Sequence, residues 1–292
     1  MLDLQVTAVD EDIGAFGKVT YTVAPDDLFG VFPDGRVYLQ RPLDREETAY
    51  HSLTVTARDG GERSSQATVV VYVTDVNDNR PRFLKDSYVF YLSENESLGT
   101  VVGRVTATDA DVGRNADLSY KFTSNTDYFV IHERTGLISS AVTIDRERLV
   151  QDNGQDSFQL DVLVTDDGVV PKTASASVNI VVVDKNDNAP QFTEKIYSAE
   201  IFENADVGSR LTTVSAKDPD KEANGEVVYG SDDDRFEVDS ATGVVSLAVS
   251  LDREETSVYE VTVTASDKGD PVMSSKAKVK IPREMPCPIK SS

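Results

Sequence analysis

The sequence is poor in residues that cross-link chains or bind soft metals. It contains two histidines and a single cysteine, Cys287. One cysteine cannot form an internal disulfide, and a zinc site would lack the nitrogen and sulfur ligands that zinc prefers. Tryptophan is absent as well. Because an immunoglobulin domain is built around a cysteine pair and a buried tryptophan, that type of β-sandwich is disfavoured.

Long apolar segments are also missing. No stretch approaches the ~18 consecutive apolar residues of a membrane-spanning helix. Residues 1–5 lack the basic region and apolar run of a secretion signal. We therefore expect the chain as given to carry neither a signal nor an anchor, so that an extracellular role requires it to be a segment of a longer protein.

Positive charge is scarce relative to negative charge. The chain has 29 Lys and Arg against 51 Asp and Glu, a net charge of −22. Such a surface repels nucleic acid phosphates and anionic lipids, so we expect no nucleic acid partner and no membrane contact by this segment itself. The 39% hydrophobic and 27% charged residues are typical of folded chains, and 292 residues suffice for two or three domains.

The acidic residues recur in motifs at domain-sized intervals. An Asp-x-Asp pair, an Asp-Arg-Glu, a lone Asp and an Asp-x-Asn-Asp-Asn follow one another in fixed order. They begin at Asp10, Asp109 and Asp218; at Asp44, Asp145 and Asp252; at Asp59, Asp166 and Asp267; and at Asp75 and Asp184. This self-similarity predicts three copies of one unit, with the pentapeptides at the joins.

Short β-branched and aromatic segments separate the acidic motifs. They include residues 87–92, 100–108, 158–165 and 174–183, and Gly, Asn and Asp turns bound them. Their apolar residues recur with a period of two, which buries one face of a strand. Lys276, Lys278 and Lys280 alternate on one such strand, where we expect them to protect a sheet edge. Several short strands per ~100 residues predict antiparallel β-sandwiches.

The acidic motifs consist of hard oxygen donors, which suit Ca²⁺. An EF-hand loop beginning at each Asp-x-Asp would need Glu at its twelfth position, but Tyr21, Tyr120 and Tyr229 stand there. An enzyme with paired carboxylates is disfavoured because an active site is usually built once from different groups, whereas this set repeats with no nucleophile or base. We predict a calcium-binding protein rather than an enzyme.

In order and phase, these motifs resemble those of cadherin extracellular repeats. The resemblance covers about residues 1 to 284 and includes Glu94-Asn95. It implies an all-β chain of three tandem seven-stranded Greek-key β-sandwiches, with typically three shared Ca²⁺ ions at each junction. The repeats would span 1–81, 82–190 and 191–284, the first lacking its opening strand, and a non-repeat tail would follow at 285–292.

The resemblance implies a complete ligand set between the second and third repeats. The two ions nearer the second repeat would bind Glu94, Asp145, Glu147, Asp184 and Asp187 with the carbonyl of Lys185. The third ion would bind Asn186, Asp218, Asp220 and Asp267 with the carbonyls of Asn188 and Asn224. Asp218 or Asp220 would also bridge.

The first junction is expected to lack one ligand. It offers Asp44, Glu46, Asp75, Asn77, Asp78, Asp109, Asp111 and Asp166, with the carbonyls of Val76, Asn79 and Asn115. The counterpart of Glu94 would lie before residue 1, together with the missing strand. We therefore expect the first repeat to fold poorly alone.

The two ends carry incomplete sets. Asp10, Asp12 and Asp59 form half a site at one end, and Glu203, Asp252 and Glu254 form half a site at the other. Residues 283–288 stand where the next Asp-x-Asn-Asp-Asn would begin. We expect neither end to bind Ca²⁺ well.

These features predict a mechanical role for the metal. Two like charges ~4 Å apart repel by ~1 kcal/mol in water and ~4 kcal/mol at an effective dielectric constant of ~20, so Ca²⁺ would turn a hinged chain into a rod. Our leading hypothesis is a calcium-dependent cell–cell adhesion ectodomain fragment, an extracellular part of a plasma-membrane protein. Its partner would be another cadherin on a neighbouring cell, homophilic or heterophilic.

The alternative hypothesis is a Ca²⁺-stiffened extracellular spacer, or a matrix- or carbohydrate-binding module, without self-adhesion. The absence of tryptophan excludes adhesion by exchange of an N-terminal tryptophan, so protocadherins or Fat- and Dachsous-like proteins are the better comparison. Asn95-Glu96-Ser97 matches the N-glycosylation pattern of a glycoprotein. It adjoins Glu94, however, and such tripeptides are often unused.

Overall fold

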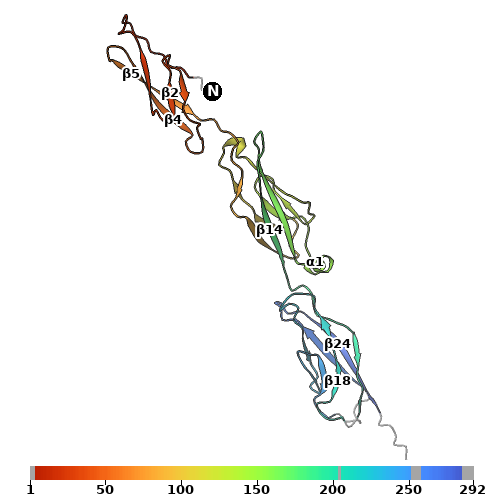
Figure 1. The fold of residues 1–292 in the computed structure, drawn as a ribbon. Coiled ribbons are helices and arrows are strands. Elements are labelled where there is room, and N and C mark those ends of the chain that lie inside the picture. Colours follow the sequence, from red (N-terminus) through yellow and green to blue (C-terminus); the bar gives the residue numbers. More distant parts are fainter. Residues whose placement is uncertain (1–3, 203–204, 251–257, 285–292) are drawn as a thin grey trace, which may run out of the picture.

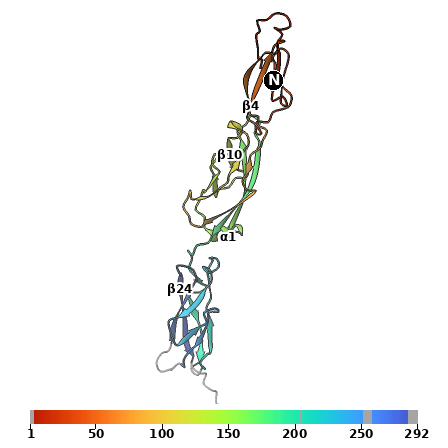
Figure 2. The ribbon, with the colours of Figure 1, turned by 90° about the vertical axis from the view of Figure 1, so that its left-hand side faces the viewer.

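The described residues, 4–202, 205–250 and 258–284 of the computed structural model, form three β-rich units. Two perpendicular views show the units end to end in an elongated row (Figures 1 and 2). Short segments that contain the two Asp-x-Asn-Asp-Asn pentapeptides connect them. Among the described residues, no helix has the length and apolar character needed to cross a membrane.

The second unit is a complete two-sheet sandwich. Its first sheet has the order β10-β13-β14-β7 and its second the order β11-β12-β8. These strands are β7 (Ser87–Ser93), β8 (Val101–Arg104), β10 (Leu118–Phe122), β11 (Phe129–Ile131), β12 (Leu137–Ser140), β13 (Ser157–Asp166) and β14 (Thr173–Val183). A short pair, β6 (Arg82–Phe83) with β9 (Ala107–Thr108), lies beside them. The predicted seven-stranded sandwich is confirmed.

The period-two pattern accounts for the core of this unit. Along β13 the side chains of Leu160, Val162 and Val164 are buried, and the residues between them are exposed or half-buried. Ile138 of the facing sheet and Ile180 of β14 are fully buried among them. Full burial of one such side chain stabilises a fold by ~1.5–3 kcal/mol relative to exposure.

One short helix, α1 (Arg146–Asn153), was not predicted. Asp145 caps its start, since its carboxylate accepts a hydrogen bond from the Arg148 amide at 2.8 Å. Gly154 ends the helix with a left-handed φ of 75°, a conformation that glycine adopts without strain. Leu149 packs into the core. Figure 1 shows α1 at the end of the second unit that faces the third.

The third unit repeats this arrangement. One sheet joins β16 (Ile196–Ser198) and β17 (Ile201–Phe202) to β24 (Ser274–Glu284), then β23 (Val258–Ser266) and β20 (Val228–Ser231). The other has the order β18 (Arg210–Thr213), β22 (Val244–Leu247) and β21 (Phe236–Val238). The short pair is β15 (Gln191–Phe192) with β19 (Ala216–Lys217). In both complete units the second strand after the join, β7 or β16, pairs parallel to the last strand of the unit.

The expected role of the three alternating lysines was wrong. β24 pairs with β23 on one side and with β16 and β17 on the other, so it is an interior strand of its sheet. Lys278 and Lys280 instead form ion pairs with Glu260 at 3.0 and 3.3 Å on the outer face. A period of two identifies the exposed face of a strand but not its place in the sheet.

The first unit is the smallest sandwich. Its sheets have the orders β1-β4-β5 and β2-β3, formed by β1 (Thr20–Ala24), β2 (Phe29–Val31), β3 (Val37–Leu39), β4 (Tyr50–Arg58) and β5 (Ser64–Tyr72). No described residue pairs with β5 as β7 pairs with β14. In the first unit a single bridge between Gln5 and Arg36 takes the place of the pairing between β8 and β12 in the second unit. Among the described residues the unit therefore lacks its opening strand, as predicted, and its second strand is reduced to that bridge.

Candidate metal centres at the two junctions

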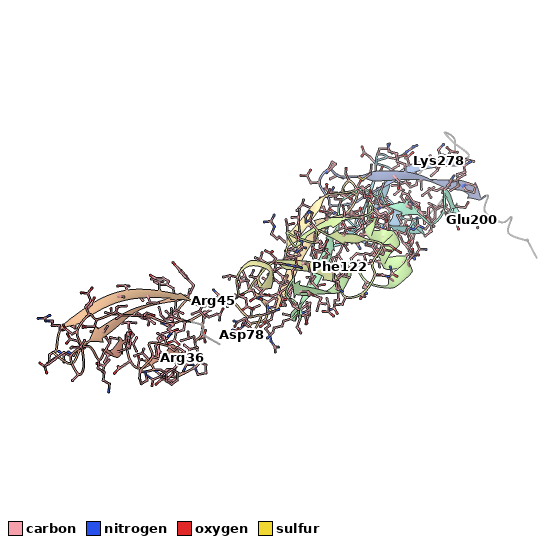
Figure 3. All side chains as sticks on the ribbon, turned by 90° about the horizontal axis from the view of Figure 1, so that it is seen from above. Arg36, Arg45, Asp78, Phe122, Glu200 and Lys278 are labelled. Atoms are coloured by element: carbon pink, nitrogen blue, oxygen red, sulfur yellow. The ribbon has the colours of Figure 1, made fainter. Side chains whose placement is uncertain are left out.

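Carboxylates from neighbouring units converge at each junction. At the second junction, oxygens of Glu94, Glu147 and Asp184 lie within 4.8 Å of one another, and so do oxygens of Glu147, Asp187 and Asp220. At the first, Glu46, Asp78 and Asp111 form the counterpart of the latter group. Figure 3 shows Asp78, with Arg45 near it, at the end of the first unit. The groups with Asp220 and Asp111 include an acid of the following unit, so a cation there would join two units, whereas the group with Glu94 is formed by the second unit and the segment that follows it.

Glu94 is the most deeply placed acid of the second junction. Its side chain is fully buried, with 0% exposure. One carboxylate oxygen accepts a hydrogen bond from the Arg146 amide at 2.8 Å, and the other accepts one from the Lys185 amide at 2.7 Å. These amides hold Glu94 between the start of α1 and the segment that leads to the third unit.

The first two Asp-Arg-Glu motifs present their acids from the start of a turn or helix. Asp145 caps α1, and Glu147 lies in its first turn. In the first unit the Asp44 carboxylate accepts hydrogen bonds from the amides of Glu46 at 2.9 Å and Glu47 at 3.2 Å. Asp44 and Asp145 do not belong to the groups whose oxygens lie within 4.8 Å of one another.

Asparagines of the connecting segments reach the lone Asp of the following unit. The Asn77 amide donates to Asp166 at 2.8 Å, and the Asn186 amide donates to Asp267 at 3.1 Å. The same amides also donate to backbone carbonyls of the following unit, at 3.1 Å to Val170 and at 2.6 Å to Pro271. With their amide nitrogens so engaged, the Oδ1 atoms of both asparagines are left as acceptors.

The last asparagine of each pentapeptide binds the second Asp of the following Asp-x-Asp. Asn79 donates to Asp111 at 2.8 Å, and Asn188 donates to Asp220 at 2.7 Å. Asp111 and Asp220 are nearly buried, at 4% and 8% exposure. The connecting segments are thereby fixed to the following unit on two sides.

Four buried oxygens at the junctions have neither a hydrogen-bond donor nor an ion-pair partner among the described residues. They are Oδ1 of Asn77 and Oδ2 of Asp109 at the first junction, and Oδ1 of Asn186 and Oδ2 of Asp218 at the second. A buried acceptor without a partner costs ~1–3 kcal/mol. The same pair of atoms is left without a donor at both junctions, so this is a shared feature of the two junctions rather than an isolated packing fault. Such oxygens are of the kind that hard cations bind.

The remaining predicted ligands take two kinds of position. The Val76 and Lys185 carbonyls accept hydrogen bonds from the amides of Asp78 and Asp187, at 2.7 and 2.9 Å. The side chains of Asn115, at the end of the short helix η1 (Gly113–Asn115), and of Asn224 donate to Asp75 and Asp184, at 2.8 and 2.9 Å. These two side chains therefore link a unit to the preceding segment, a role that the sequence did not predict.

Burial, together with repulsion between the carboxylates, raises the pKa of three acids at the second junction. Burial, together with the negative charge of Glu94, raises the pKa of Glu147 to about 7. Burial also raises the pKa of Asp187, with Glu94 and Asp220 adding to the effect. Burial raises the pKa of Asp218 as well, with the negative charges of Asp220, Asp267 and Asp184 adding to the effect. A cation would relieve this repulsion.

Sequence reasoning missed two glycines at the junctions. A Cβ on Gly168 would lie 2.0 Å from Nδ2 of Asn77, and a Cβ on Gly269 would lie 2.3 Å from Nδ2 of Asn186. Their amides donate to Asp166 and Asp267 at 2.9 and 3.0 Å. The signal was present, because a glycine follows the lone Asp by two residues in all three units, Gly61 included.

The sequence placed Asn95 in the Glu94-Asn95 motif and in a glycosylation pattern, without predicting a contact for its side chain. In the structure it has a positive φ of 58°, and its side-chain nitrogen donates to Asp187. The atom to which a glycan would be joined therefore contacts an acid of the second junction.

The ends of the chain are described in part. Oxygens of Asp10, Asp12 and Asp59 lie within 4.8 Å of one another at the tip of the first unit. Phe16 stands where Asn115 and Asn224 stand in the other units, and it is exposed. Glu203, Asp252, Glu254 and the 285–292 tail lie outside the described residues.

Comparison with known families follows the same division of the chain. Residues 3–74, 88–183 and 197–282 each match the cadherin domain model. Protocadherin Fat 4 of Homo sapiens is 37% identical over 287 residues, which cover 95% of this chain and 6% of that protein. Protein dachsous of Drosophila melanogaster is 36% identical over 296 residues, which cover 94% of this chain and 8% of that protein. The chain thus spans a small fraction of these relatives.

Solved structures agree with the sequence relatives. A crystal structure of a mouse cadherin-23 fragment superposes with a TM-score of 0.72 at 32% identity, and the match covers 96% of this chain and 90% of that one. A cis-dimer structure of protocadherin gammaB7 superposes with a TM-score of 0.82 at 27% identity, covering 94% of this chain and 69% of that one.

Proposed function

Since this chain belongs to the cadherin family of adhesion proteins, which are not enzymes, we propose that it is a calcium-dependent segment of a cell–cell adhesion ectodomain. Ca²⁺ would bind at both junctions and hold the three repeats in line. The Fat-like and protocadherin relatives confirm the predicted branch of the family. The location outside the cell, as part of a plasma-membrane protein, belongs to the proposal.

The observation that carries the calcium proposal is the set of oxygens without donors at equivalent positions of both junctions. Asn186 Oδ1 and Asp218 Oδ2 come from the connecting segment and the third repeat, and Asn77 Oδ1 and Asp109 Oδ2 are their counterparts. Ca²⁺ binds carboxylate and amide oxygens in sets of six to eight, whereas zinc prefers nitrogen and sulfur. The residues present therefore fit a calcium ion.

The residues that would hold the ions at the second junction are the predicted ligands. Glu94, Glu147, Asp184, Asp187 and Asp220 make up the groups within 4.8 Å, while Asn186 and Asp218 supply the free acceptors. Bound Ca²⁺ supplies positive charge between units that otherwise repel. Because the ligands come from both repeats, binding restricts bending.

The proposed adhesive partner is another cadherin on a neighbouring cell. Support comes from the family and from the elongated row of repeats (Figure 2), which suits a molecule that reaches between surfaces. Aggregation of beads coated with the chain, measured with Ca²⁺ and with a chelator, distinguishes adhesion from a spacer role. Calcium-dependent rigidity without aggregation would favour the spacer or matrix-binding alternative.

The calcium proposal is tested by titration. We expect the metal-free chain to bind Ca²⁺ at ~10⁻⁴ to 10⁻³ M, the range of extracellular modules, with a rise in thermal stability. Asp218→Asn should weaken binding at the second junction about tenfold or more, because it removes a charge from a buried ligand. Asp234→Asn, at an exposed acid of the same repeat, is the control. A melting temperature unchanged by millimolar Ca²⁺ would contradict the proposal.

A further inference from the structure

The arginines of the first two Asp-Arg-Glu motifs lie at the junctions, where Arg146 is buried and Arg45 half-buried, although the motif suggested a role only for its acids. The Arg146 side chain is 6% exposed and the Arg45 side chain 13% exposed. A guanidinium is always charged, so its burial is unfavourable unless anions and acceptors surround it. We propose that Arg146 and Arg45 are positioning residues that clasp the connecting segment to both flanking repeats without a metal ion.

Arg146 contacts three parts of the chain. Its Nε lies 2.6 Å from Oδ1 of Asp184, in the connecting segment, and 3.3 Å from Oε1 of Glu147, in its own helix. Its Nη2 donates to the Pro219 carbonyl of the third repeat at 3.5 Å. One side chain therefore joins the second repeat, the linker and the third repeat.

Arg45 makes the same set of contacts at the first junction. It pairs with Asp75 of the connecting segment and with Glu46 beside it. Its Nη2 donates to the Ala110 carbonyl of the second repeat at 2.7 Å. Ala110 and Pro219 are the middle residues of their Asp-x-Asp pairs. Figure 3 shows Arg45 at the end of the first repeat that faces the second.

The carboxylate held by each arginine is also held by the following repeat. Oδ2 of Asp184 accepts hydrogen bonds from the Lys221 amide at 3.1 Å and from Asn224 at 2.9 Å. Oδ2 of Asp75 accepts them from the Val112 amide at 3.2 Å and from Asn115 at 2.8 Å. Each aspartate thus connects an arginine of one repeat to amides of the next.

A surface ion pair at the second junction provides a contrast. Lys221 Nζ lies 2.8 Å from Asp156 and also crosses the junction, but its side chain is 51% exposed. Exposed pairs of this kind contribute ~0–1 kcal/mol. At the first junction Val112 occupies the place of Lys221, so this pair is not repeated. The two arginine side chains are far less exposed, at 6% and 13%, and their contacts occur at both junctions, which is why we assign the clasp to them.

The planar fork of arginine is essential to this role. It presents donors in two directions, so Nε can meet a carboxylate while Nη2 reaches a carbonyl. Lysine would retain the charge but not the second contact. The clasp deepens the proposed function, because it keeps the repeats aligned before Ca²⁺ binds and so prearranges Asp184 and Glu147.

The test measures alignment in the metal-free full chain. Spin labels at the exposed Gln159 and Glu237, in Cys287→Ser background, report the distance distribution across the second junction. We expect Arg146→Lys and Arg146→Gln to broaden this distribution by at least about twofold, because an untied linker samples many orientations. Saturating Ca²⁺ should narrow it again in the wild type and in both variants.

Arg148→Gln is the matched control. Arg148 is two residues away on α1 with a side chain 79% exposed, and it pairs only at 3.6 Å with Asp152. Its variant should match the wild type. If Arg146→Lys gives the wild-type distribution without metal, the clasp is wrong. If Arg146 variants do not fold, as judged by thermal unfolding in Ca²⁺, Arg45→Lys against the exposed Arg41→Gln decides the question at the first junction.

Failure of the calcium proposal would look different. In that case the wild-type distribution would not change on addition of Ca²⁺, whatever the arginine variants do. The clasp is judged only on metal-free samples, so the two outcomes are separable.

Discussion

At the second junction Glu94 is fully buried beside Glu147 and Asp184, whereas no described residue stands in its place at the first junction. The other acids and asparagines of the two junctions take equivalent positions, including the oxygens without donors. Burial raises the pKa of Glu147 to about 7 at the second junction. At the first junction a different acid is shifted: for Asp75, which occupies the place of Asp184, burial is outweighed by hydrogen bonds from Asn115 and the Val112 amide and by the charge of Arg45, so that its pKa is lowered.

This difference shows how one buried carboxylate changes a shared design. Glu94 supplies both oxygens to backbone amides and lies within reach of two other acids. It concentrates negative charge in a place that water cannot screen. We therefore expect the second junction to bind Ca²⁺ more tightly than the first, and to repel itself more strongly when metal is absent.

The largest effect should come from making the second junction resemble the first. Glu94→Gln removes the charge but keeps an acceptor for one of the two amides. We expect the Ca²⁺ concentration that narrows the Gln159–Glu237 distance distribution to rise about tenfold to a hundredfold, since a hydrogen-bonded buried charge contributes ~1.5–3 kcal/mol. The midpoint of that titration measures the effect.

Glu96→Gln is the control for this variant, because Glu96 is 40% exposed and pairs with Lys185. It should leave the midpoint unchanged. If Glu94→Gln also leaves it unchanged, Glu94 is a structural acid rather than a ligand, and the difference between the two junctions has another origin.

A smaller and more local effect is expected at the glycines. Gly269→Ala would place a Cβ 2.3 Å from Asn186, and Gly168→Ala would place one 2.0 Å from Asn77. Overpacking of this kind typically costs ~1–3 kcal/mol. Each variant should weaken Ca²⁺ binding about tenfold at its own junction and leave the other junction unaffected.

Gly230→Ala is the control, because no atom lies within 4 Å of a Cβ built there. Calorimetric titration of all three variants with Ca²⁺ shows at which junction binding is weakened. Equal loss at both junctions from either single variant would mean that the junctions are coupled, which the comparison above does not predict.

The repeated motifs and the period of two predicted the three sandwiches and the acids that meet at their joins. Both signals are local, so they do not depend on how strands pair. What could not be predicted depends on pairing at long range. The Lys276 strand was assigned to an edge because its neighbour β16 lies far away in sequence, and the loss of a second strand in the first repeat shows only in the sheet order.

Within the site, residue type predicted ligands but not their supporting contacts. Asp145 was assigned to calcium, yet it also caps α1, because one carboxylate serves two purposes at a helix start. The arginines were overlooked because a cation beside a proposed cation site suggests no function. Their role depends on the Pro219 and Ala110 carbonyls of the next repeat, which no spacing in the sequence indicates.

The smallest expected effect is a pH dependence of the melting temperature in the absence of metal. It tests whether the acids of the second junction repel one another. In the folded chain, where the second junction is formed, the pKa of Glu147 is raised from 4.5 to about 7. Between these pH values the folded state therefore binds more protons than the unfolded state. The folded state is then favoured at low pH, and that advantage is lost as the pH rises from about 4.5 through about 7. In metal-depleted buffer we expect the melting temperature to fall by roughly a few degrees between pH 5 and pH 8. Glu147→Gln should remove this part of the slope, and a slope that persists in full would assign it to other acids.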